Sequence, residues 1–150
     1  MEKYRELEDI VKDYEELRSN FSSFSKSGDS NKETLLEFQH RFVDLKADLR
    51  YWHTKMLHAS ENRSDKGATA IKMRIAVSMV KGEYPFSEGE TPMYEKLPTI
   101  TNADKFAAAT KEYKKFLEQR TFYKESFVNV ADLREDITSY ITLLRDKNNR

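Results

Sequence analysis

The sequence predicts an all-α fold, an elongated helical bundle of the coiled-coil type, from three observations. Apolar residues recur at alternating steps of three and four along two long stretches, which places them on one side of a slightly under-wound helix. Charged residues make up 35% and hydrophobic residues 38% of the 150 residues, a composition typical of charged helical proteins. All three prolines lie between residues 82 and 100, so long helices are confined to either side of that connection.

The first expected element is a helix over residues 1–18. A serine-rich run that contains Gly28 follows it and predicts a linker. The apolar side of this first helix is formed by Tyr4, Leu7, Ile10, Val11, Tyr14 and Leu17.

A long basic helical arm is expected over residues 30–81. Ser30 and Glu33 have the spacing of a capping box, in which both side chains satisfy backbone amides at a helix start. Arg63 and Lys66 occupy core-type positions beside Gly67, which predicts an interruption near residues 60–67. The apolar seam of this arm runs through Leu35, Phe38, Phe42, Leu45, Leu49, Trp52 and Met56, and resumes in the same phase at Ala70, Met73, Val77 and Val80.

Residues 82–100 are predicted to form a short irregular or hairpin connection, since aromatic residues flank Glu88-Gly89-Glu90. Thr101 is the expected cap of a final helical arm over residues 101–147. By length, residues 1–150 are expected to form a single helical domain. Its exposed seam residues exceed what one three-helix packing covers, so a homo-oligomer is expected. The seam of the final arm contains Phe106, Ala109, Tyr113, Phe116, Tyr123, Phe127, Val130, Ile137, Ile141 and Leu144.

The sequence gives no support to catalysis. The four glycines are scattered, so no phosphate-binding glycine loop is present, and no serine lies in a nucleophile elbow. Glu37 and His40 have the Glu-x-x-His spacing of di-iron bundles, but a single copy outside the seam favours a solvated helical face. We therefore expect no enzyme, no catalytic residue, no metal and no cofactor.

The expected location is the cytoplasm. The chain has no cysteine, which excludes disulfides and thiolate metal sites and favours an intracellular setting. Its first residues lack the apolar core of a signal peptide, and no run of about 18 apolar residues occurs. No membrane contact is therefore expected.

Zero net charge conceals segments of opposite sign. Residues 1–39 contain six basic and ten acidic residues, whereas residues 40–81 contain nine basic and four acidic ones. Clustered Lys and Arg residues neutralise phosphates, which makes the basic cluster a candidate nucleic-acid site. Alternatively, its cations pair with the first helix, at Glu6, Glu8, Asp9, Asp13, Glu15 and Glu16. The candidate site consists of Arg63, Lys66, Lys72, Arg74 and Lys81.

Short motifs within residues 45–125 also resemble a known family. They are Trp52 in the basic helix, Lys72-Met73-Arg74, Gly82-Glu83-Tyr84, Tyr94-Glu95-Lys96 and Ala103-Asp104-Lys105. In this order they resemble the phage recombination mediators of the UvsY type, which are small, helical, cysteine-poor oligomers. Where that family has paired tyrosines and Ser-Gly after the basic pair, this chain has Ala76-Val77-Ser78-Met79-Val80.

The resemblance implies a non-enzymatic accessory protein that binds single-stranded DNA as an oligomer and helps to load a recombinase. Lys72 and Arg74 would contact phosphates, with Arg63, Lys66 and Lys81 extending the track, and a phage-encoded chain would act in the host cytoplasm. A second hypothesis is a helical protein–protein interaction or assembly module, such as a phage structural or host-inhibiting protein, without nucleic-acid binding.

Overall fold

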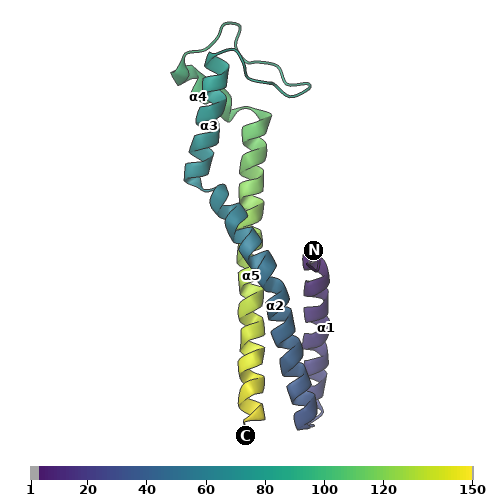
Figure 1. Ribbon diagram of the computed structural model, residues 1–150. Coiled ribbons are helices and arrows are strands. Elements are labelled where there is room, and N and C mark those ends of the chain that lie inside the picture. Colours follow the sequence, from purple (N-terminus) through teal and green to yellow (C-terminus); the bar gives the residue numbers. More distant parts are fainter. Residues whose placement is uncertain (1–3, 150) are drawn as a thin grey trace. The chain divides into compact units, whose positions relative to one another are not determined.

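All regular structure in the described part of the chain, residues 4–149, is helical, which confirms the all-α prediction (Figure 1). In this computed structural model, contacts divide the chain into two compact units. Unit 1 contains residues 1–56 and 126–150, and unit 2 contains Leu57–Glu125. The expectation of a single domain stays a prediction. The helices are α1 (Leu7–Lys26), α2 (Lys32–Asn62), α3 (Asp65–Val80), α4 (Ile100–Ala108) and α5 (Lys111–Asn148).

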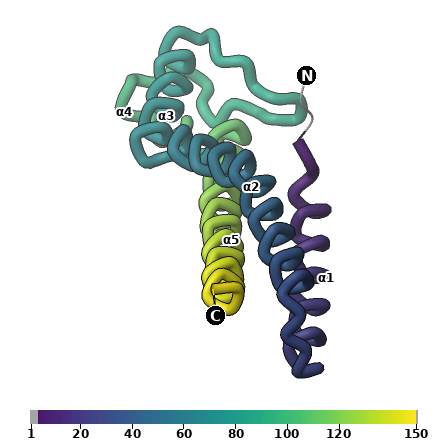
Figure 2. The backbone as a smooth tube through the Cα atoms, turned by 60° about the horizontal axis from the view of Figure 1, so that its bottom comes forward, coloured from purple at the N-terminus to yellow at the C-terminus, as the bar shows by residue number. Residues whose placement is uncertain are grey.

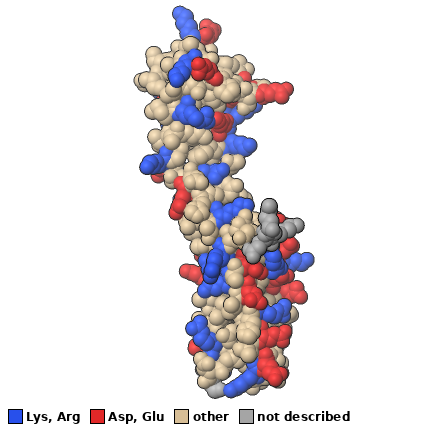
Figure 3. Space-filling model, in the orientation of Figure 1, with Lys and Arg blue, Asp and Glu red and all other residues tan. Residues whose placement is uncertain are grey.

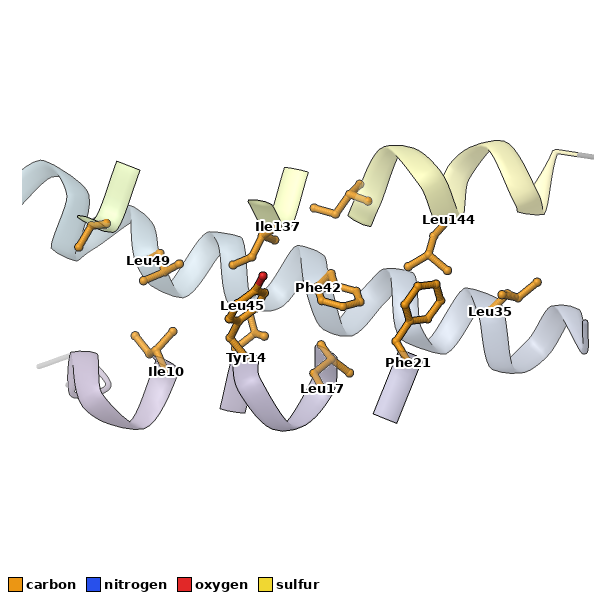
Figure 4. Packing of buried hydrophobic residues seen from close by; sticks show 12 residues of the cluster. Ile10, Tyr14, Leu17, Phe21, Leu35, Phe42, Leu45, Leu49, Ile137 and Leu144 are labelled. Carbon is orange, nitrogen blue, oxygen red and sulfur yellow. The ribbon is translucent and has the colours of Figure 1, made fainter. Parts of the chain in front are cut away.

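Unit 1 is built on the predicted seam. Figure 4 shows α2 running between α1 and α5, with Phe42 and Leu45 among the side chains that fill the space between the helices. The ring of Phe42 stacks on Tyr140, with centroids 4.8 Å apart, and Phe21 meets both rings edge-on. Such ring pairs contribute about 0.5–1.5 kcal/mol each beyond simple burial. The core contains Ile10, Tyr14, Leu17, Phe21, Leu35, Phe42, Leu45, Leu49, Val130, Ile137, Ile141 and Leu144.

Helix α1 extends to Lys26, eight residues beyond the end that the sequence predicts. Serine lowers helix propensity by only a few tenths of a kcal/mol per residue. Burial of Phe21, one turn beyond Leu17, stabilises the helix by about 1.5–3 kcal/mol and therefore outweighs that loss. Residues 1–3 of the predicted helix lie outside the described residues.

The cap of α2 is Asn31 rather than Ser30. The Asn31 Oδ1 atom accepts a hydrogen bond from the Thr34 amide at 3.0 Å, and the first helical residue is Lys32. An asparagine side chain caps a helix as well as a serine does, so the pattern predicted the start correctly to within two residues.

In unit 2 the basic arm is interrupted between Asn62 and Asp65, inside the predicted interval 60–67. The Ser64 hydroxyl accepts a hydrogen bond from the Gly67 amide and caps α3. A Cβ atom at position 67 would collide with the carbonyl oxygen of Asn62. The tight turn between α2 and α3 therefore requires glycine at this position.

Helices α3 and α4 pack against each other around a core of their own. Three alanines let the two backbones approach closely, and Tyr84 closes the core from the connection. The six buried residues are Ile75, Ala76, Met79, Tyr84, Ala103 and Ala107.

The connection between α3 and α4 is irregular and contains no strand, so its hairpin alternative is not formed (Figure 2). Its ring contacts run from Tyr84 to Phe86, Tyr94 and Phe106. The Glu90 carboxylate accepts hydrogen bonds from the Lys111 amide at 2.8 Å and the Ser87 amide at 3.1 Å, which lower the pKa of Glu90.

The final arm is divided into α4 and α5, whereas the sequence predicts one arm over 101–147. The buried Thr110 hydroxyl donates to the Ala107 carbonyl at 2.7 Å and accepts from the Tyr113 amide at 3.2 Å, so it ends one helix and starts the next. Thr99, not Thr101, caps α4 through the Asn102 amide. None of the helices in the described residues has the length and apolar character needed to cross a membrane.

Candidate functional site

The five cations of the predicted nucleic-acid site all lie in unit 2, but they do not form one track. Lys66, Lys72 and Arg74 belong to α3, Arg63 lies in the turn before α3, and Lys81 follows its last residue. At about 100° per residue, Lys72 and Arg74 point about 200° apart around the helix. A single flat strand would meet both side chains only if one of them reached round the helix or if neighbouring subunits shared the track.

Arg63 is a packing residue. Its guanidinium lies 4.6 Å from the centre of the Tyr123 ring and donates hydrogen bonds to the Ala59 carbonyl and the Gln119 amide oxygen. The Nε atom is buried and has no hydrogen-bond partner. A cation that is half-buried against an aromatic ring is already engaged, so Arg63 is removed from the candidate phosphate contacts.

Lys72 and Arg74 have acidic partners within unit 2. The Lys72 Nζ atom lies 3.4 Å from the Asp104 carboxylate, and the Arg74 guanidinium binds both carboxylate oxygens of Glu112. These two cations therefore pair within the chain. The partners belong to α4 and α5, however, and not to the acidic first helix that the sequence suggested.

Lys66 and Lys81 are exposed, and the described residues give neither of them an ion-pair partner. These two lysines are therefore the residues of the predicted site that remain available to an external anion. Asp65, which is adjacent to Lys66, pairs with Arg120 but keeps 93% of its side chain exposed.

The charge of unit 2 as a whole is nearly balanced. Residues 57–125 contain twelve basic and ten acidic residues, a net charge of +2. On the face seen in Figure 3, basic and acidic side chains are interspersed around α3 and α4, with uncharged surface between them. Non-specific nucleic-acid affinity comes from clustered positive charge, and the face of unit 2 visible in Figure 3 carries no such cluster.

Helix α3 also carries exposed apolar residues, which the sequence pattern had placed in the buried seam. Met73, Val77 and Val80 are 50%, 37% and 36% exposed, although they were expected to continue the seam of α2. The side of α3 that packs into unit 2 instead carries Ala68, Ile75, Ala76 and Met79. We call the exposed set of Ala70, Met73, Val77 and Val80 the α3 apolar face.

The interruption before α3 explains the error. Arg63 and Ser64 are not helical, so α3 starts with a new rotation about its axis and does not inherit the phase of α2. Helix α3 is apolar on two sides, and periodicity alone cannot tell which of two apolar sides is buried. Its second apolar side was a signal of a binding surface that could have been read from the sequence.

In unit 1, two basic side chains, His53 and Arg134, contact each other. Arg134 donates a hydrogen bond to the Nδ1 atom of His53 at 3.3 Å, and the His53 ring lies 5.1 Å from that of Phe127. Burial, and secondly the positive charge of Arg134, lower the pKa of His53. His53 is therefore neutral near pH 7 and serves packing. Among the described residues, no three His, Cys, Asp or Glu side chains are placed to hold a metal.

Comparison with known proteins gives no match. No family model, no curated protein and no solved structure matches the chain. The resemblance of short motifs in residues 45–125 to the UvsY-type mediators stays a prediction.

Proposed function

We propose that the chain is a non-enzymatic helical interaction module that binds another protein through the α3 apolar face. The observation that carries this proposal is the exposure of Met73, Val77 and Val80 on a helix whose opposite side is already buried in unit 2. Covering apolar surface contributes about 25 cal/mol per Å², and helices commonly bind partners through residues at these spacings.

The packing of α3 supports this role. Its inner side lies against Ala103 and Ala107 of α4, so the helix is held in place before any partner arrives. A surface that is already ordered loses little conformational entropy on binding. The pairing of Lys72 and Arg74 within unit 2 points in the same direction, because it leaves apolar contact as the main property of this surface.

A photo-crosslinking amino acid at position 77 tests the proposal in cells that produce the protein. We expect a crosslinked product of discrete mass from position 77 and none from Lys115, an exposed α5 position of the same unit. Absence of a product at position 77, or equal yields at both positions, would reject the proposal.

Single-stranded DNA binding with recombinase loading in the cytoplasm is the second candidate. The observation that favours it is that Lys66 and Lys81 are exposed and unpaired within the described residues. DNA titration at two salt concentrations tests it. Replacing both lysines by alanine should lower the salt slope of binding by about 0.7 for each lost phosphate contact. A parent chain that does not bind DNA at low salt would reject this candidate.

A further inference from the structure

We propose that the partner of the α3 apolar face is the same face of a second copy of this chain, packed antiparallel about a two-fold axis near residue 75. This inference rests on the proposed interaction function and names its partner. An isologous contact of this kind requires one surface to complement itself, both in shape and in charge.

The apolar residues of the face meet that requirement. At about 100° per residue, its four residues lie within an arc of about 80° on one side of α3. In antiparallel order about residue 75, Ala70 lies opposite Val80 of the second copy, and Met73 lies opposite Val77. Each contact thus combines a smaller with a larger side chain, and the same contacts recur in reverse on the other side of the axis.

The charges at the two ends of α3 select the antiparallel order. Asp65 and Lys66 lie at its amino end, and Lys81 and Glu83 lie just beyond its carboxyl end. Antiparallel packing brings Lys66, which lies in line with the apolar face, near Glu83 of the second copy. Parallel packing would instead place Lys66 beside Lys66 and Lys81 beside Lys81, which is unfavourable.

These charged groups are accessible. Lys66, Lys81 and Glu83 are exposed and have no ion-pair partner among residues 4–149. Asp65 is contacted by Arg120, yet 93% of its side chain is open to solvent. A second copy can therefore supply counter-charges without breaking an ion pair within unit 2.

The apolar surface continues beyond the end of α3. Helix α3 is followed by Gly82 at φ +72°, and the Leu97 side chain lies against this glycine while remaining 60% exposed. Helix α3 has 16 residues and is therefore about 24 Å long. A face of this length and about 10 Å in width has an area well below the roughly 800 Å² per partner of a stable interface. We therefore expect a weak and reversible dimer.

Sedimentation equilibrium across micromolar concentrations tests the association. The parent chain should approach twice its mass of 17.7 kDa as its concentration rises. Val77→Glu should raise the dissociation constant at least about tenfold, because it places two carboxylates in an apolar contact. Lys115→Glu is the matched control and should leave association unchanged. A parent that stays monomeric at 100 µM, the test concentration, overturns the inference.

Charge reversal tests the orientation. Lys66→Glu and Glu83→Lys should each weaken the dimer by roughly twofold to thirtyfold, since the two-fold axis repeats the ion pair and each exposed pair contributes about 0.2–1 kcal/mol. The double variant carrying both changes should recover parental affinity, because position 66 again faces an opposite charge at position 83 of the second copy. Failure of the double variant to recover overturns the antiparallel arrangement.

Cysteine crosslinking gives a second test of orientation, helped by the absence of native cysteine. A mixture of Ala70→Cys and Val80→Cys chains should react with a short bismaleimide to give a crosslinked heterodimer. Neither variant alone should crosslink, because ten residues separate the two equivalent cysteines by about 15 Å along the helix. Crosslinking of Ala70→Cys alone would indicate parallel packing and overturn the inference.

Different experimental outcomes reject the interaction function and the self-pairing. If the chain is monomeric while the photo-crosslinker at position 77 captures a protein that is not a second copy, the interaction function stands and self-pairing is rejected. If position 77 captures nothing, both are rejected.

Discussion

In unit 1 the residues of the predicted seam lie in the core, whereas in unit 2 the seam residues of α3 lie in solvent. Phe42 and Leu49 are fully buried, but Met73, which lies 24 residues beyond Leu49 in the same heptad phase, is half exposed. The two regions differ because α2 is continuous through the first set and interrupted before the second. A heptad phase is a property of one helix, and it carries no information across a non-helical turn.

The largest expected effect is the difference in stability between a substitution in the buried seam of unit 1 and one on the exposed face of α3. Phe42→Ala should reduce the free energy of unfolding by about 3–5 kcal/mol, because it opens a cavity under the Tyr140 and Phe21 rings. Met73→Ala should change stability by only about 0.5 kcal/mol in either direction, measured below the concentration at which the chain associates. Urea denaturation followed by circular dichroism measures both. Equal losses would show that Met73 is a core residue and would end the comparison.

The next effect concerns the interruption that separates the two helices. Gly67→Ala should destabilise unit 2 by about 1–3 kcal/mol, since the new methyl group would collide with the Asn62 carbonyl. Gly28 provides the control in unit 1: it has φ +77° and no atom near its Cβ position, so Gly28→Ala should cost about 1–2 kcal/mol from backbone strain alone. Hydrogen exchange can assign each loss to its unit. Loss of protection in α3 and α4 is expected only for Gly67→Ala.

The smallest effect is a pH dependence confined to unit 1. Because the pKa of His53 is lowered in the folded chain, the unfolded chain binds a proton more readily. Stability should therefore fall as the pH drops below about 6.5 and level off below the folded-state pKa of His53. His53→Gln should remove that part of the pH dependence in thermal unfolding between pH 7 and pH 5. An unchanged profile in the variant would mean that His53 is not the responsible group.

The candidate nucleic-acid site shows how far sequence reasoning reached. Its five cations lie in one unit, and the alternative that they pair with the acidic first helix was wrong for Lys72 and Arg74, which pair within unit 2. Their partners Asp104 and Glu112 could not be identified, because they lie 32 and 38 residues further along the chain. Arg63 was placed at a core-type position, and the structure shows why a cation can occupy it: Tyr123 lies against the guanidinium.

By itself the sequence determined the helical class, the start of α2, the interruption near residue 63 and the core of unit 1. These follow from local periodicity, from capping side chains and from prolines, which act within a few residues along the chain. The tertiary structure alone decided which apolar side of α3 is covered, since that depends on Ala103 and Ala107 of α4 arriving from a distant segment. The division of the final arm at Thr110 was missed although its signal is local, since the Thr110 hydroxyl bonds to the Ala107 carbonyl and the Tyr113 amide, each three residues away. Non-local packing chooses between two faces that are equally apolar, and the face it leaves uncovered is the one available to a partner.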